Sequence, residues 1–144
     1  MTTASVTVPA TPDSVRPASQ FIVQTARDLG VPAAASPLFE VAVVEALANA
    51  VKHGARAKTD ATVTCEVERT DTGLSIRIYD DGEGFTPTAR PVPALDEDDV
   101  DVTAVPESGY GVPIMQSVFH DIHAERRNGR FCLELKLVSE LPLT

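Results

Sequence analysis

The chain has 144 residues, 43% of them hydrophobic, which is enough for one domain of ordinary size with a real core. Its 21 acidic and 12 basic residues give a formal net charge of −9, which argues against nucleic acid or an anionic membrane as the main ligand, because phosphate groups require a basic patch. No apolar run reaches membrane-spanning length and the first residues lack signal-peptide features, so we expect a cytoplasmic protein.

The N-terminal part of the chain predicts a short strand and then an amphipathic helix. The strand covers residues 3–8. Residues 13–29 carry apolar side chains at helical spacing, and Gly30 directly after them is a typical helix stop.

A second helix is predicted over residues 36–52. Ser36 suits the N-cap and Pro37 suits the first helical position. Apolar residues that recur at spacings of three and four are predicted to form the buried stripe of this helix. They are Val41, Val44, Ala48 and Val51.

Another face of the same helix carries polar side chains. Glu45, Asn49 and His53 are each four apart, so they lie one above another, with Lys52 beside them. A carboxylate and a carboxamide one turn apart suit a general base and a Mg²⁺ ligand, because the amide oxygen is a hard, neutral donor. The alternative is a polar helix face without chemistry, since this spacing occurs in many chains.

A β-hairpin is predicted next, with strands over residues 61–69 and 74–80. The second strand runs into Asp80, which Gly82 and Gly84 follow. A carboxylate at a strand end can accept a hydrogen bond from an amino group, while glycine backbone passes close to a flat ring. The alternative for this segment alone is an ordinary turn rich in Asp and Gly.

Residues 86–108 predict a long irregular segment, which we call the lid, with an acidic run over residues 95–101. The turn Gly109-Tyr110-Gly111 then leads into an apolar helix that ends near Phe119. A glycine-rich turn at a helix start presents free N–H groups and the positive end of the helix dipole, which suits a phosphate. It is not a P-loop, because no Gly-Lys-Ser/Thr follows.

The chain ends in a second hairpin around Asn128-Gly129. Strands and helices that do not alternate strictly predict an α+β fold: a two-layer α/β sandwich with a mixed, mostly antiparallel sheet covered on one face by helices. Residues 1–144 are expected to form one domain. Cys65 is predicted to be a small buried hydrophobe, and no zinc site is expected because Cys65 and Cys132 form no Cys-x-x-Cys motif.

Together, the segments 45–54, 80–85 and 109–115 resemble the motifs of GHKL-type, histidine-kinase-like ATPase domains, which share the Bergerat ATP-binding fold. The resemblance covers about residues 5–138. Within that superfamily, the runs 44–54 and 80–85 are most similar to those of the small serine/threonine kinases that act as bacterial anti-sigma factors.

The resemblance implies roles for individual residues. Glu45 would be the general base, and Asn49 would bind the Mg²⁺ that bridges the phosphates. Asp80 would accept the adenine amino hydrogen bond, with Gly82 and Gly84 shaping the base pocket. The remaining residues assigned to cofactor binding are Lys52, His53, Phe85, Gly109, Tyr110, Gly111 and Val112.

The function that the resemblance implies is an ATP- and Mg²⁺-dependent serine/threonine protein kinase. It would bind a sigma factor as a homodimer and phosphorylate an anti-anti-sigma protein of the STAS type on serine, with no direct contact to nucleic acid or membrane. Two alternatives stay open. One is a catalytically weak binding module, favoured by the acidic lid and by the lack of Lys and Arg between residues 91 and 125. The other is an ATPase that hydrolyses ATP without transferring phosphate to protein.

Overall fold

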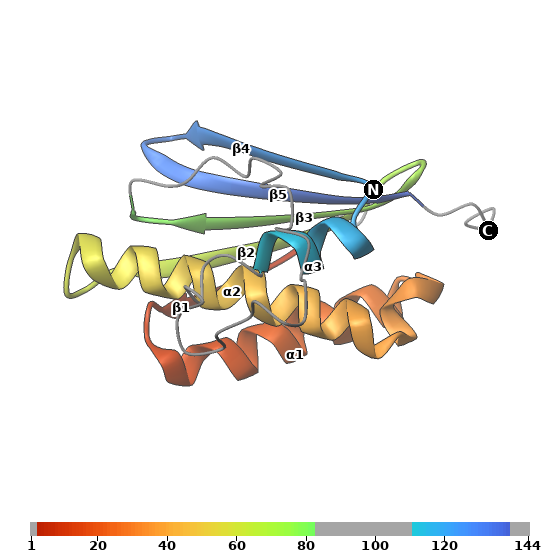
Figure 1. The fold of residues 1–144 in the computed structure, drawn as a ribbon, viewed down its shortest axis with the longest axis horizontal. Helices are drawn as coiled ribbons and strands as arrows, with labels where there is room; N and C mark the ends of the chain where they lie inside the picture. The colour runs from red at the N-terminus through yellow and green to blue at the C-terminus, as the bar shows by residue number, and fades with distance from the viewer. Residues whose placement is uncertain (1–2, 83–110, 139–144) are drawn as a thin grey trace, which may run out of the picture.

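The computed structural model describes residues 3–82 and 111–138, with side chains over 3–82 and 114–138 (Figure 1). The strands are β1 (Thr3–Pro9), β2 (Thr62–Arg69), β3 (Gly73–Asp80), β4 (Asp121–Arg127) and β5 (Arg130–Val138). The helices are α1 (Pro12–Asp28), α2 (Pro37–Ala57) and α3 (Gly111–Val118), with a short 3-10 helix, η1 (Pro32–Ala35), between α1 and α2.

The strands form one sheet in the order β1-β2-β3-β5-β4, and the three α-helices cover one face of it (Figure 1). The predicted α+β sandwich is therefore confirmed. Among the described strands, all neighbouring pairs are antiparallel, whereas the prediction allowed a mixed sheet. Hydrophobic alternation gives the face of a strand but not the direction of its neighbour, which explains this difference.

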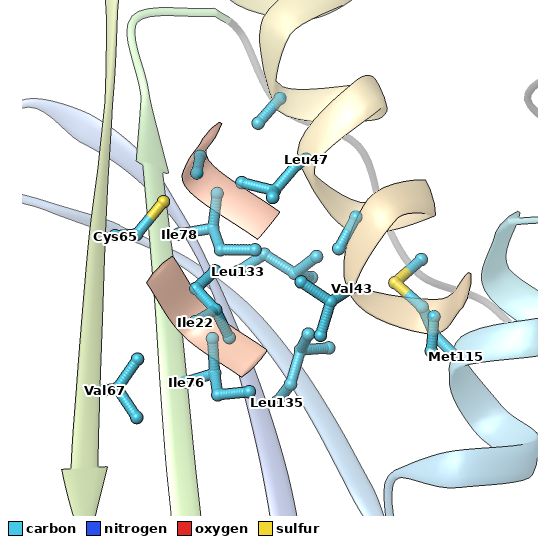
Figure 2. Packing of buried hydrophobic residues seen from close by; sticks show 14 of the residues in the cluster. Ile22, Val43, Leu47, Cys65, Val67, Ile76, Ile78, Met115, Leu133 and Leu135 are labelled. Carbon is cyan, nitrogen blue, oxygen red and sulfur yellow. The ribbon is translucent and has the colours of Figure 1, made fainter. Parts of the chain in front are cut away.

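The core lies between the sheet and the helices. Figure 2 shows Ile22 of α1 with Val43 and Leu47 of α2 against the inward-facing residues of the sheet. The sheet residues labelled there are Cys65, Val67, Ile76, Ile78, Leu133 and Leu135. Cys65 is fully buried, as predicted, and burial raises the pKa of its thiol to about 12. It is thus a packing residue and not a reactive thiolate.

Helix α2 begins as predicted but is longer and is turned differently about its axis. The Ser36 hydroxyl accepts a hydrogen bond from the Leu38 N–H, which confirms the N-cap. The helix continues to Ala57, beyond the predicted end at Lys52. The predicted buried stripe is wrong in part, because Val41 is 43% exposed and Ala48 is also exposed. The buried residues are instead Phe39, Ala42, Val43, Ala46, Leu47, Asn49, Ala50, Val51 and Gly54.

The reason is the position of α2 between its neighbours. It contacts α1, α3 and the sheet, so its buried face is broader than a single stripe. Gly54 lies inside the helix, where a Cβ would make a tight contact of 3.2 Å with the Ala10 Cβ and an ordinary contact of 3.9 Å with the Asp80 Cβ. The part of α2 beyond the predicted end at Lys52 thus packs against the residue that follows β1 and against the end of β3.

The predicted turns are confirmed. Gly30 ends α1 with φ of +80°, and the Val31 N–H bonds the Ala26 carbonyl across the helix end. Asn128 and Gly129 both have positive φ, as a two-residue hairpin turn of this type requires. Across residues 3–82 and 111–138, no helix has the length and apolar composition needed to cross a membrane.

Candidate functional site

The structure brings residues 80–82, which we call the Asp80 loop, against the C-terminal part of α2. A Cβ on Gly82 would lie 2.8 Å from the His53 backbone oxygen and 2.9 Å from the His53 Cβ. Both distances are too short for real atoms, so only glycine allows the loop to approach α2 this closely. The first two sequence segments therefore meet in space, as a shared site requires.

His53, which contacts the loop, lies on the polar face of α2, with Asn49 one turn and Glu45 two turns before it. Asn49 is only 9% exposed, and Glu45, Lys52 and His53 are half-buried. Within the described part of the chain, the Asn49 carboxamide makes no hydrogen bond and the Glu45 carboxylate makes no ion pair. An amide and a carboxylate without a side-chain partner among these residues are available to bind a ligand, which is the chemistry the motif predicts. Burial, Arg56 and Lys52 lower the pKa of His53, which favours its neutral form.

Asp80 ends β3 and is 1% exposed. Its Oδ1 accepts a hydrogen bond of 2.7 Å from the Gly82 N–H, while among the described residues nothing donates to its Oδ2. Burial raises the pKa of Asp80 to about 6, against the lowering effect of the Gly82 N–H and of Arg130. A buried carboxylate with an oxygen left to accept a hydrogen bond suits recognition of an amino group.

Sequence reasoning missed the residues that hold this loop in place. Asp81 accepts a hydrogen bond from the Thr62 N–H at 3.0 Å, and it pairs with Arg130 Nε at 3.1 Å. Arg126 Nη1 donates to the Gly82 carbonyl at 3.2 Å. The signal in the sequence was the pair of adjacent acids, but their different roles depend on which strands are neighbours.

The third segment is described only in part. Helix α3 begins at Gly111, as predicted, and packs on α2. The ring centroid of Phe119, the residue after α3, lies 5.8 Å from that of Phe39 in α2. Several residues that the sequence assigns to nucleotide binding lie outside the described residues. They are Gly84, Phe85, Gly109 and Tyr110, together with the side chain of Val112 and the lid over residues 86–108. Their places in the site stay predictions.

Residues 8–137 match the family of the histidine kinase-like ATPase domain. The chain belongs to this family. The match covers most of the chain, and it confirms the predicted GHKL-type relationship and identifies the chain as an ATP-binding module. No curated protein matches the chain.

In this histidine kinase-like ATPase domain, the residues present fit a magnesium nucleotide. The Asn49 carboxamide offers a neutral oxygen of the kind that Mg²⁺ accepts alongside phosphates and water. Asp80 offers a carboxylate oxygen for a base amino group, and Gly82 keeps the backbone beside it free of a side chain. Among the described residues, no group of three or more His, Cys, Asp or Glu side chains is placed to hold a metal ion.

Replacing Gly82 with alanine tests the close approach of the two segments. Because the added Cβ would overlap backbone and the Asp80 carboxylate, the loop must shift, and we expect Gly82→Ala to destabilise the protein by about 1–3 kcal/mol. Gly54→Ala is the matched control. Its Cβ meets the Ala10 Cβ at 3.2 Å, and the gain in helix propensity of about 1 kcal/mol offsets that contact. Urea unfolding measures both; equal stability of the two variants would contradict the proposed packing.

Proposed function

We propose that this histidine kinase-like ATPase domain is an ATP-dependent protein kinase that phosphorylates a serine or threonine of a partner protein. The observation that carries the proposal is the half-buried Glu45, one turn from the buried Asn49 on a helix whose C-terminal part contacts the Asp80 loop. This arrangement supports a base and a metal ligand close to the place where a nucleotide would bind.

In the proposed reaction, the Glu45 carboxylate accepts the proton of the attacking hydroxyl, whose oxygen forms a bond to the γ-phosphorus of ATP as the bond to ADP breaks. Positioning and electrostatics supply most of the catalysis in phosphoryl transfer. A Mg²⁺ held by the Asn49 oxygen would neutralise phosphate charge. Asp80 would hold the base by accepting its amino hydrogen bond.

The proposed biological role is that of an anti-sigma factor in the cytoplasm. On the resemblance of the motifs, the chain would bind a sigma factor as a homodimer and phosphorylate an anti-anti-sigma protein of the STAS type on serine. The net charge of −9 supports protein partners over direct contact with nucleic acid.

A second candidate function is a catalytically weak binding module with the same fold. The charge distribution favours it: no Lys or Arg occurs between residues 91 and 125, and the acidic run 95–101 lies in the same stretch. Of the cations that follow the polar face of α2, Lys58 is 53% exposed and lies 3.8 Å from Asp81. Less positive charge near a triphosphate would weaken ATP binding and phosphotransfer.

The experiment that separates these functions has two steps. Calorimetry with Mg-ATP first measures nucleotide binding, and radiolabelled ATP is then incubated with the chain and a STAS-type protein from the same genome. Label on the STAS protein supports the kinase. Binding of ATP with release of labelled phosphate alone would replace the kinase with an ATPase, and partner binding without either reaction would favour the weak module.

A further inference from the structure

We propose that Arg130 is a positioning residue for the nucleotide base: by holding Asp81, it fixes the backbone of Asp80 and Gly82 and thereby sets a preference for adenine over guanine. This inference rests on the proposed nucleotide site. It adds a residue that lies far from the three motifs in the sequence and that does not itself touch the base.

The Arg130 guanidinium reaches from β5 across the end of β3 to β2. Arg130 begins β5, and its partners on β2 lie beyond β3 in the sheet order. Its Nη2 donates to the Thr62 carbonyl at 2.7 Å and to the Thr62 hydroxyl at 3.2 Å, and its Nη1 donates to the Thr64 hydroxyl at 2.9 Å. Its Nε donates to Asp81 Oδ1 at 3.1 Å. The planar, rigid guanidinium thus donates to the Asp81 carboxylate and to Thr62 and Thr64 of β2.

Asp81 transmits this anchoring to the loop. Its second oxygen, Oδ2, accepts from the Thr62 N–H at 3.0 Å, so one carboxylate is bonded to both β2 and β5. The Thr62 N–H, Arg130 and Lys58 lower the pKa of Asp81, which therefore keeps its charge over a wide pH range. Asp81 lies between Asp80 and Gly82 in the sequence, so holding its side chain restricts the backbone on either side.

Arg126 provides a second attachment from the same hairpin, since its Nη1 donates to the Gly82 carbonyl at 3.2 Å. The loop is therefore bonded to the β4–β5 hairpin at two consecutive residues. Among the described residues, only the Gly82 N–H donates a hydrogen bond to the Asp80 carboxylate, at Oδ1. Its Oδ2 is therefore available to accept a hydrogen bond from a ligand.

The chemistry of the two purine bases explains the expected selectivity. Adenine presents an amino group where guanine presents an oxygen, so a fixed carboxylate accepts a hydrogen bond from the first and repels the second. Sites built around such a bond reject the wrong ligand strongly because buried polar groups would be left unpaired. If the loop moves, the carboxylate loses its fixed position and this difference falls.

The test is Arg130→Gln, with dissociation constants measured by calorimetry for AMP, ADP, ATP and GDP. We expect affinity for the three adenine nucleotides to fall by about tenfold, which is the loss of most of one charged hydrogen bond, with GDP unchanged. Arg130→Lys keeps the charge near Asp81 but cannot reproduce the planar donors, so its ADP-to-GDP preference should be intermediate. Asp81→Asn should repeat the loss of preference, which keeps the test valid if Arg130→Gln does not fold.

Arg127→Gln is the matched control. Arg127 lies opposite Arg130 in the same hairpin, but it pairs with Glu125 and not with Asp81. It should leave the ADP-to-GDP preference unchanged.

Three outcomes would overturn the inference. A loss that grows from AMP to ATP would mean that Arg130 contacts phosphate directly, and an equal loss for ADP and GDP would mean a general structural defect. A wild-type preference for ADP that survives Arg130→Gln would also refute the positioning role while leaving the proposed function intact. Failure of the wild-type chain to bind any of the four nucleotides would overturn both.

Discussion

Glu45→Gln is expected to reduce phosphotransfer to a partner serine by about 10²–10⁴-fold, while Mg-ATP still binds. A general base acts in the transition state, where it removes a proton that is still present when ATP is merely bound. Glutamine keeps the size of the side chain and removes its basicity. Glu45 is half-buried and makes no ion pair among the described residues, so no salt bridge there is lost.

Single-turnover transfer of radiolabelled phosphate measures this effect, and calorimetry measures binding. Glu40→Gln is the control, because Glu40 is an exposed acid on the same helix, in its first turn. Asn49→Ala should instead weaken the Mg²⁺-dependent part of nucleotide binding. Equal loss of binding in Glu45→Gln and Asn49→Ala would show that the two residues do not have separate roles.

Asp80→Asn is expected to have two effects of opposite sign. Adenine nucleotide affinity should fall by roughly ten- to a hundredfold, because a charged hydrogen bond contributes about 1.5–3 kcal/mol. The stability of the protein without nucleotide should rise at pH 8, because the variant no longer buries a carboxylate that is 1% exposed. Weaker nucleotide binding together with higher stability is expected where a binding residue lowers the stability of the free protein.

The pH dependence follows from the raised pKa of Asp80, about 6 in the folded protein. Between the pKa of the unfolded chain, near 3.9, and about 6, the folded state binds more protons, so the Asp80 contribution to stability is present at low pH and is lost as pH rises. The free energy of unfolding of Asp80→Asn should therefore exceed that of the wild type by about 3 kcal/mol at pH 8, and this difference should disappear near pH 4.

Urea unfolding at several pH values measures this difference. Asp71→Asn, at the exposed turn of the β2–β3 hairpin, is the control and should change little at any pH. A stability difference between Asp80→Asn and wild type that does not vary with pH would contradict a carboxylate with a raised pKa.

Wild-type affinity for ADP should also fall as pH decreases through about 6, because a protonated Asp80 is a poorer acceptor.

Local signals in the sequence predicted most of the fold. The Ser36-Pro37 start of α2, the Gly30 end of α1 and the Asn128-Gly129 turn are all present, because each depends on a few neighbouring residues. The extension of α2 from Lys52 to Ala57 was missed, since it packs against Ala10 and Asp80, which lie far from it in the sequence. Periodicity alone also misplaced the buried face of α2, because it does not show that α2 packs against both α1 and α3.

The roles of the site residues stay predictions, but their places on the elements could be predicted in part. Spacing placed Glu45 and Asn49 on one face of α2, and the strand end placed Asp80 beside a glycine. The bonds of Arg130 to Asp81 and of Arg126 to Gly82 were missed, because they depend on the sheet order and join residues far apart in the sequence. No local pattern marks an arginine that reaches across the end of a neighbouring strand.

The most direct test of the nucleotide site is hydrogen exchange with and without Mg-ADP. We expect slower exchange over residues 45–54 and 80–82, and also over residues 109–112, which the sequence assigns to the phosphates. Asp80→Asn should reduce this protection at any fixed Mg-ADP concentration below saturation. Saturating Mg-ADP that binds by calorimetry but protects neither 45–54 nor 80–82 would show that the nucleotide binds elsewhere, and the account of the site would be wrong.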